Sequence, residues 1–378
     1  MRKWVIFGFA LSFLFACAKK EDVIKVGEFG GLTGSTATFG ISTKNGIDMA
    51  TEEINAAGGL LGKKVRVIVE DDRCLAEEAA SAVKKLVTQD KVVAVLGEVA
   101  STRSLAGAPI CQENQVPMVT PSSTNPKVTE VGDYIFRVCF IDPFQGEAMA
   151  KFAFDNLKVK KAAILKDGKS DYSVGLGQYF AETFKKLGGQ IVADESYFEG
   201  DQDFKAQLTS IKGKKPEAIF IPGYYTEVGL IARQARELGL NIPLLGGDGW
   251  DSPKLTEIAT IKQPGDALKD CYFSNHYASD DPNPVIQDFI KKYQAKYSEV
   301  PDAMAVLGYD AAHILYDAIK RAGSTEGPKI RDELAKTANF PGVAGLTTID
   351  SARNARKPLV VLKIIEGGKY QYTATVNP

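Results

Sequence analysis

The stretch that decides the fold class is residues 92–126, which read VVAVLGEVASTRSLAGAPICQENQVPMVTPSSTNP. Its first residues, Val92–Leu96, form a short apolar run that is typical of a strand buried on both faces. Thr102–Asn114 follows as a predicted helix, and Met118-Val119 begins another short strand. A strand, a helix and a second strand in close succession indicate a parallel sheet covered by helices.

The same alternation continues on both sides of this stretch. It begins with a strand at Val23–Phe29, restarts with a helix at Gln145–Leu157 and runs to a helix at Pro253–Ala259. Two such rounds predict an α/β protein with two doubly wound parallel-sheet lobes. Later helices and a terminal hairpin indicate that the chain returns to the first lobe and then crosses back. The three expected crossovers lie near Cys139–Asp142, Cys271–Asn275 and Leu346–Arg353.

The N-terminus has the pattern of an export signal. Arg2 and Lys3 precede an apolar run, Trp4–Ala16, which is too short to span a bilayer but fits a secretory signal. The run ends in Leu14-Phe15-Ala16-Cys17, which resembles a bacterial lipobox with Cys17 as the lipidated first mature residue. The alternative is an ordinary cleaved signal with an incidental cysteine. In either case we expect an exported protein, and a lipid on Cys17 would anchor it to a membrane.

These patterns also divide the chain into parts. The predicted division is 1–16 for the signal peptide, 17–22 for the lipid-anchor tether, 23–140 and 273–348 for the first lobe, and 141–272 and 349–378 for the second lobe.

Composition and motifs favour a binding protein over an enzyme. Lys and Arg total 46 against 47 Asp and Glu, so no basic excess points to nucleic acid. Only His276 and His313 are present, and no Gly-rich phosphate loop, GxSxG elbow or CxxC pair occurs. The acidic pairs Asp71-Asp72 and Asp280-Asp281 fit solvated loop ends better than metal ligands. We therefore expect no catalytic centre, no metal and no cofactor.

Polar residues follow several of the predicted strands. In open α/β sheets, ligands bind beyond the carboxyl ends of the strands. Ser101 stands there at the start of a helix, where free N–H groups could hold a carboxylate, or it could simply cap that helix. Thr120–Pro126 is a hydroxyl-rich loop after the next strand, and Asp248 lies among three glycines after Ile242–Leu245. Anion-binding loops on one lobe and a carboxylate on the other would together hold a zwitterion, that is, an α-amino acid.

These residues carry a resemblance to a known family. Gly97–Pro126, with Gly223-Tyr224-Tyr225 and Gly247-Asp248-Gly249, resembles the leucine/isoleucine/valine-binding family of periplasmic solute-binding proteins. Gly31–Gly40 and Arg137–Pro143 support the resemblance, which covers nearly all of residues 23–378. It implies the type I periplasmic-binding-protein fold, with two lobes that close on a solute and hand it to an ABC permease in the inner membrane.

The resemblance also implies roles for first-lobe residues. Ser101 matches a serine that binds the ligand carboxylate, and Thr124 matches a threonine that contacts carboxylate and ammonium. Ser122 lies where a backbone carbonyl accepts a hydrogen bond from the ammonium. Phe39 stands where the family often has Tyr, and it lacks that hydroxyl.

Three second-lobe residues complete the implied site. Tyr172 and Tyr224 match aromatic residues that close over the ligand. Asp248 falls where the branched-chain binders place an acidic residue, usually Glu, against the ammonium, and Asp is one methylene shorter. The expected ligand is therefore a branched-chain or similar apolar amino acid, and the protein is expected to act as a monomer. A small amide or carboxylate solute, or a role in amino-acid sensing, remains an alternative.

Two further expectations concern cysteines and tryptophan. Cys139 and Cys271 both fall on predicted crossovers that run side by side, so they are candidates for a disulfide, with two buried thiols as the alternative. Trp250 follows Asp248 by two residues and is expected at the mouth of the cleft, unless it only caps the end of the second-lobe sheet.

Overall fold

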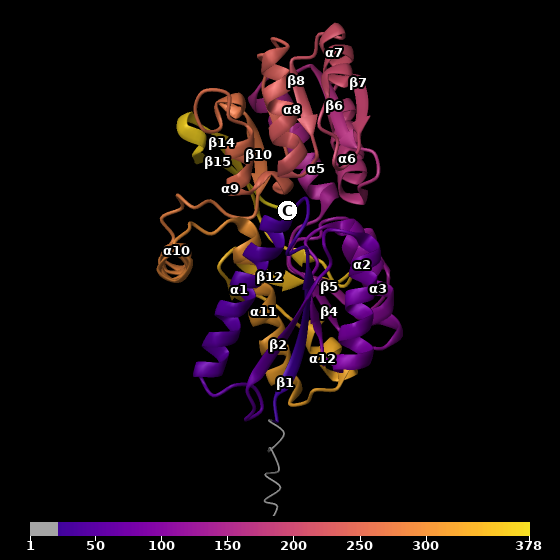
Figure 1. Cartoon of the computed structure of the whole chain (residues 1–378), viewed down its shortest axis with the longest axis vertical. Helices are drawn as coiled ribbons and strands as arrows, with labels where there is room; N and C mark the ends of the chain where they lie inside the picture. Colours follow the sequence, from indigo (N-terminus) through magenta and orange to yellow (C-terminus); the bar gives the residue numbers. More distant parts are fainter. Residues whose placement is uncertain (1–21) are drawn as a thin grey trace, which may run out of the picture.

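The computed structural model describes residues 22–378, which form two α/β lobes stacked along the long axis of the molecule (Figure 1). The predicted signal peptide and Cys17 therefore lie outside the described residues, as does the predicted tether apart from Asp22. Within the described part, no helix combines the length and apolar composition that a membrane span requires.

The first lobe contains a five-stranded parallel sheet in the order β2-β1-β3-β4-β5. Helices cover both faces of this sheet, because successive side chains of a strand point to opposite sides. On β1, Val26 packs in the core that includes Ile47, whereas Phe29 packs in the core that includes Val83. The bounds are β1 Ile24–Gly30, β2 Val65–Asp71, β3 Val95–Leu96, β4 Met118–Thr120, β5 Ile135–Arg137, α1 Ala37–Ala56, α2 Ala76–Lys85, α3 Ser101–Glu113 and α4 Lys127–Glu130.

The second lobe contains a seven-stranded sheet in the order β15-β14-β10-β9-β8-β6-β7. The strands from β6 to β10 are parallel, and the terminal hairpin of β14 and β15 joins beside β10 in the antiparallel sense. The bounds are α5 Asp142–Lys151, β6 Lys161–Asp167, α6 Asp171–Lys186, β7 Gln190–Tyr197, α7 Lys205–Gly213, β8 Ala218–Ile221, α8 Tyr225–Glu237, β9 Leu244–Gly246, α9 Pro253–Ile258, β10 Tyr272–Asn275, β14 Leu359–Ile364 and β15 Tyr370–Val376.

After β10 the chain returns to the first lobe (Figure 1). There α11 packs closely along α1 and along α12, and a small antiparallel sheet of β11, β12 and β13 follows. The bounds are α10 Pro284–Tyr297, α11 Ala303–Ala322, α12 Gly327–Leu334, β11 Phe340–Gly342, β12 Gly345–Ile349 and β13 Ala355–Arg356.

Two crossovers fall later in the chain than the sequence suggested. Residues 273–275, expected in the first lobe, belong to β10, which pairs with β9 and β14 of the second-lobe sheet. The stretch expected to cross at Leu346–Arg353 instead contains most of β12, which pairs with β11 and β13. In both places a short run pairs with neighbouring strands before the chain leaves the lobe, and such pairing is not visible in the local sequence.

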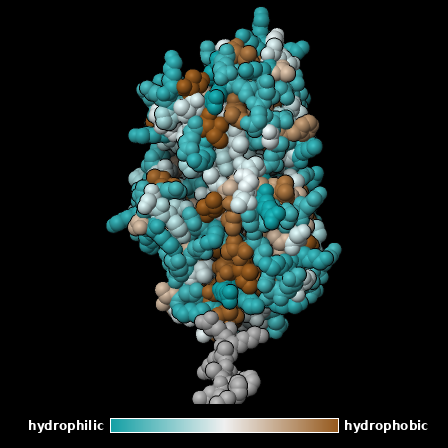
Figure 2. Space-filling model, in the orientation of Figure 1, coloured by the Kyte–Doolittle hydropathy of each residue, from teal (hydrophilic) through white to brown (hydrophobic). Residues whose placement is uncertain are grey.

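The face of the molecule seen in Figure 2 is largely hydrophilic over both lobes. A hydrophobic strip runs between α1 and α2 of the first lobe, where β2 forms the edge of the sheet (Figures 1 and 2).

Candidate ligand-binding site

The two lobes touch along the edges of the cleft between them. Asn125 Nδ2 of the first lobe donates to the carbonyl of Asp171 in the second lobe at 2.8 Å. The Asp171 amide in turn donates to Oγ1 of Thr102 at 2.9 Å. On another edge, the Thr226 hydroxyl donates to the carbonyl of Ser35 at 2.7 Å. The structure is therefore a closed form, in which residues of both lobes enclose one site.

The first-lobe wall of the site carries unsatisfied hydroxyls. Ser101, Ser122 and Thr124 are all buried, Ser101 in the first turn of α3 and the other two in the loop after β4. Ser101 does not cap its helix, and its Oγ accepts from the Asn125 amide at 3.2 Å. Ser122 Oγ and Thr124 Oγ1 are buried with no partner among residues 22–378. Because an unpaired buried hydroxyl costs about 1–3 kcal/mol, these two groups point to a ligand that binds them.

The second-lobe wall is built around Asp248, in a short helical turn after β9. Tyr172 of α6 donates its hydroxyl hydrogen to Oδ1 of Asp248 at 2.9 Å. Its ring stacks on Tyr224 with 5.2 Å between centroids. Phe39 of the first lobe meets the Tyr224 ring edge-on at 5.8 Å, which places an apolar contact between the lobes beside the carboxylate.

His276 and Gln145 also hold Asp248, and the sequence assigned neither of them to the site. His276 Nε2 lies 3.0 Å from Oδ2, and the imidazole stacks on Phe140 at 3.8 Å. Burial lowers the pKa of His276, so the neutral ring donates from Nε2 at neutral pH. Gln145 Oε1 accepts from the Asp248 amide at 2.8 Å. The sequence could have indicated His276 as a site residue, because it directly follows a predicted crossover between the lobes. Gln145 lies within a predicted helix, and nothing in the sequence pointed to it.

Asp142 links the two walls. Its amide donates to the Thr124 carbonyl at 3.0 Å, and Gln145 Nε2 lies 3.4 Å from its Oδ1. Burial raises the pKa of Asp142 to about 8, so this carboxyl group is protonated at neutral pH. The cleft thus presents hydroxyls from the first lobe, and from the second lobe a neutral acid, Asp142, and one carboxylate, Asp248. Such an arrangement can hold an ammonium and a carboxylate of one small molecule.

Two expectations about nearby residues are wrong. Cys139 and Cys271 are free and buried, and their thiols lie in different surroundings: Cys139 Sγ approaches the Ser123 carbonyl at 3.4 Å, and Cys271 Sγ accepts from the Leu244 amide at 3.3 Å. Trp250 is not at the cleft mouth. Its side chain is fully buried, and its indole N–H donates to the carbonyl of Ile221 at 2.9 Å, within the second-lobe core.

Within residues 22–378, no group of three or more His, Cys, Asp or Glu side chains is arranged to hold a metal ion.

Two α/β lobes that close over hydroxyls on one side and a carboxylate on the other define a two-lobe solute-binding protein. The sequence profile of the periplasmic binding protein family matches residues 23–369, and the chain belongs to this family. Its relatives are substrate-binding proteins of transporters rather than enzymes, and the family implies an exported, periplasmic protein.

Named relatives are similar over most of their length. The chain is 35% identical over 320 residues to Leu/Ile/Val-binding protein homolog 3 of Brucella melitensis, covering 84% of each chain. It is 30% identical over 322 residues to the leucine-, isoleucine-, valine-, threonine- and alanine-binding protein of Pseudomonas aeruginosa, covering 85% of this chain and 84% of that one.

Two solved structures are also similar. The leucine-binding protein LivK of Thermotoga maritima has a TM-score of 0.89 and 44% identity, covering 94% of this chain and 99% of that one. The branched-chain amino acid transporter substrate-binding protein LivJ of Streptococcus pneumoniae, in complex with isoleucine, has a TM-score of 0.88 and 37% identity, covering 94% and 100%.

Proposed function

We propose that this protein captures a branched-chain or similar apolar amino acid between its lobes and delivers it to an ABC permease in the inner membrane. The observation that carries the proposal is the pairing of unsatisfied first-lobe hydroxyls, on Ser122 and Thr124, with the buried carboxylate of Asp248. The relatives are named as binders of leucine or of branched-chain amino acids, and these names support the same ligand class.

Each end of an amino acid has a counterpart in the cleft. The ligand carboxylate would accept from Ser101, Thr124 and the first amides of α3, where the helix dipole favours an anion. The ammonium would donate to Asp248, whose oxygens each keep a lone pair free beside Tyr172 and His276. The apolar side chain would lie against Phe39, which belongs to a buried hydrophobic cluster and contacts Tyr224.

Closure follows from the division of these contacts between the lobes. The ligand meets both sets only when the cleft is shut, so its binding shifts the population toward the closed form. We further propose that a lipid on Cys17 holds the protein at the membrane, and that one chain acts alone as the binding unit.

The decisive test is calorimetric titration of the purified protein with leucine, isoleucine, valine, alanine and phenylalanine. We expect saturable binding of at least one of them, weakened by about 2–5 kcal/mol in Asp248→Ala, which leaves the ammonium unpaired in a closed cleft. Asp288→Ala, an exposed carboxylate on α10, is the matched control and should bind as the parent does. Equal affinities of the parent and Asp248→Ala would remove Asp248 from the site and contradict the proposal.

A further inference from the structure

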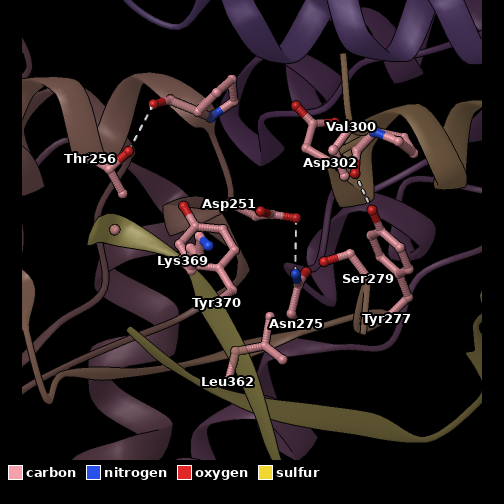
Figure 3. A pocket seen from close by; sticks show the side chains of 13 residues that line it. Asp251, Thr256, Asn275, Tyr277, Ser279, Val300, Asp302, Leu362, Lys369 and Tyr370 are labelled. Atoms are coloured by element: carbon pink, nitrogen blue, oxygen red, sulfur yellow. Dashed lines mark hydrogen bonds between the residues drawn. The ribbon is translucent and has the colours of Figure 1, made fainter. Parts of the chain in front are cut away.

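A cavity of about 410 Å³ lies outside the candidate amino-acid cleft, beside the stretch after β10 where the chain returns to the first lobe, here called the hinge. Both lobes line it: Thr256, Leu362 and Tyr370 belong to the second lobe, and Val300 and Asp302 to the first. Figure 3 shows these side chains around a common space, with the Asp251 carboxylate at its centre. The volume is within the range of sites that bind small organic molecules.

Asp251 is the central polar group of this cavity. The residue is 3% exposed, and its Oδ2 accepts from Asn275 Nδ2 at 2.9 Å and from the Ala303 amide at 2.7 Å. Its Oδ1 accepts no hydrogen bond from any residue that the structure describes. In Figure 3 the carboxylate points into the space between Tyr370 and Ser279. This oxygen lines the cavity on an otherwise buried residue, and a carboxylate oxygen without a donor is a place for a ligand that donates.

A second buried acid, Asp302, lines the same cavity. Asp302 is 8% exposed and caps α11 through the Ala305 amide, while the Ser42 hydroxyl donates to its other oxygen at 2.7 Å. Burial raises the pKa of Asp251 to about 6 and, together with repulsion by Asp251, that of Asp302 to about 7, so a cation bound between them would favour the ionised form of both. Among residues 22–378, neither carboxylate forms an ion pair with a Lys, Arg or His side chain within 4.0 Å. Two buried acids without a counter-ion favour a cation in the same cavity.

The rest of the wall determines what kind of cation fits. The rings of Tyr277 and Tyr370 line the cavity, with Leu362, Val300 and Pro301 as apolar neighbours. Aromatic faces attract ammonium groups, and apolar walls favour a ligand with a hydrocarbon body over a hydrated metal ion. We propose that the hinge cavity is a second binding site, which takes a small organic ammonium ion with its charged end at Asp251 and its apolar body against Tyr277 and Tyr370.

Lys369 allows a test in which the affinity for an ammonium ion should change in the opposite direction. It is exposed at the cavity wall, on the hairpin between β14 and β15, and forms no ion pair in the described part of the chain. Its charge repels a cation that enters. Removing it should therefore strengthen binding of an ammonium ion, whereas removing the charge of Asp251 should weaken it.

The test is calorimetric titration with butylammonium, and with 1-butanol as its neutral isostere. We expect butylammonium to bind at least about tenfold more tightly than 1-butanol, and Asp251→Asn to reduce its affinity at least about tenfold. Lys369→Met should raise the affinity about twofold, because an exposed charge contributes little. Lys291→Met, an exposed lysine on α10 with no ion pair in the structure, is the matched control and should bind butylammonium as the parent does.

Three results would overturn the proposal. The first is no saturable binding of butylammonium, and the second is equal affinity for 1-butanol. The third is loss of butylammonium binding in Asp248→Asn but not in Asp251→Asn, which would place the amine in the amino-acid cleft. Should Asp251→Asn fail to fold, the isostere comparison and the exposed Lys369→Met variant still decide the question. None of these outcomes depends on whether an amino acid binds in the main cleft.

Discussion

The Tyr172 hydroxyl donates a hydrogen bond of 2.9 Å to Oδ1 of Asp248, although the two residues lie 76 positions apart in the sequence. The same hydroxyl oxygen accepts from the amide of Gly249 at 3.2 Å, which fixes the direction of its own hydrogen. Asp248 is therefore held in one orientation from the side of α6. Tyr172 acts as a positioning residue for the carboxylate as well as a wall of the cleft.

Tyr172→Phe keeps the ring that stacks on Tyr224 but removes this donor. We expect the affinity for the amino acid to fall about threefold to tenfold, the effect of losing one ordinary hydrogen bond, because the hydroxyl acts on the ligand only by orienting Asp248. Titration calorimetry measures this affinity. Tyr179→Phe is the matched control, since Tyr179 lies on the same helix and its hydroxyl makes no hydrogen bond within residues 22–378. If Tyr172→Phe binds as tightly as the control, the hydroxyl does not orient Asp248.

Arg103 and Glu199 connect the lobes at the cleft edge. Arg103 is buried in the first lobe, where Nη1 donates to Thr36 Oγ1 at 2.9 Å and pairs with Glu98 at 3.3 Å. Its Nη2 reaches Glu199 of the second lobe at 3.5 Å, and Ser35 donates to the same carboxylate. Because these contacts across the cleft depend on closure, they should slow the release of the ligand.

Glu199→Gln should therefore increase the dissociation rate of the ligand about twofold to fivefold, since the carboxylate is partly exposed and such pairs contribute little. Stopped-flow measurement gives this rate directly. Glu195→Gln is the control, because Glu195 bonds only Ser210 within the second lobe. An unchanged dissociation rate in Glu199→Gln would show that the pair does not stabilise closure.

Glu28 makes stability depend on pH. It lies on β1 in the first-lobe core, and burial raises its pKa from 4.5 to about 8, with a smaller contribution from Asp48. The folded state therefore holds a proton that the unfolded chain releases above pH 4.5. The contribution of the protonated Glu28 to stability is fully present below pH 4.5 and is lost as the pH rises toward 8.

We expect the free energy of unfolding to decrease over this window by up to about 1.4 kcal/mol per pH unit for this group. Urea denaturation at pH 5, 6.5 and 8 measures the slope. Glu28→Gln, which is neutral at every pH, should give a flatter profile, whereas the exposed control Glu113→Gln should follow the parent. Parallel profiles for all three proteins would show that Glu28 is not protonated in the fold.

The four cysteines of the described residues should behave as inaccessible thiols. All four are buried, and burial raises the pKa of Cys139 to about 12. We expect iodoacetamide to leave Cys74, Cys111, Cys139 and Cys271 unmodified in the native protein, and to alkylate all four after unfolding without reductant. Peptide mapping measures both states. A peptide that joins Cys139 to Cys271 would contradict the structure.

The sequence alone determined the two-lobe α/β architecture and which loops carry polar groups. Apolar strands such as Val92–Leu96 stand out from the amphipathic helices between them, and this difference is local. The carboxyl end of each strand follows from the same pattern, so Ser101, Thr124 and Asp248 could be placed at strand ends before any contact was known. The resemblance carried Tyr172, Tyr224 and Phe39 to the same region.

Only the tertiary structure decided which of these groups meet. Tyr172, Gln145 and His276 come from three separate elements, and sheet order and lobe closure bring them to Asp248. The same long-range packing buries Trp250 behind β8, keeps Cys139 apart from Cys271 and opens the cavity at Asp251. These facts depend on side chains from segments far apart in the chain, whose relative positions are fixed by strand pairing and core packing, and no local pattern encodes them.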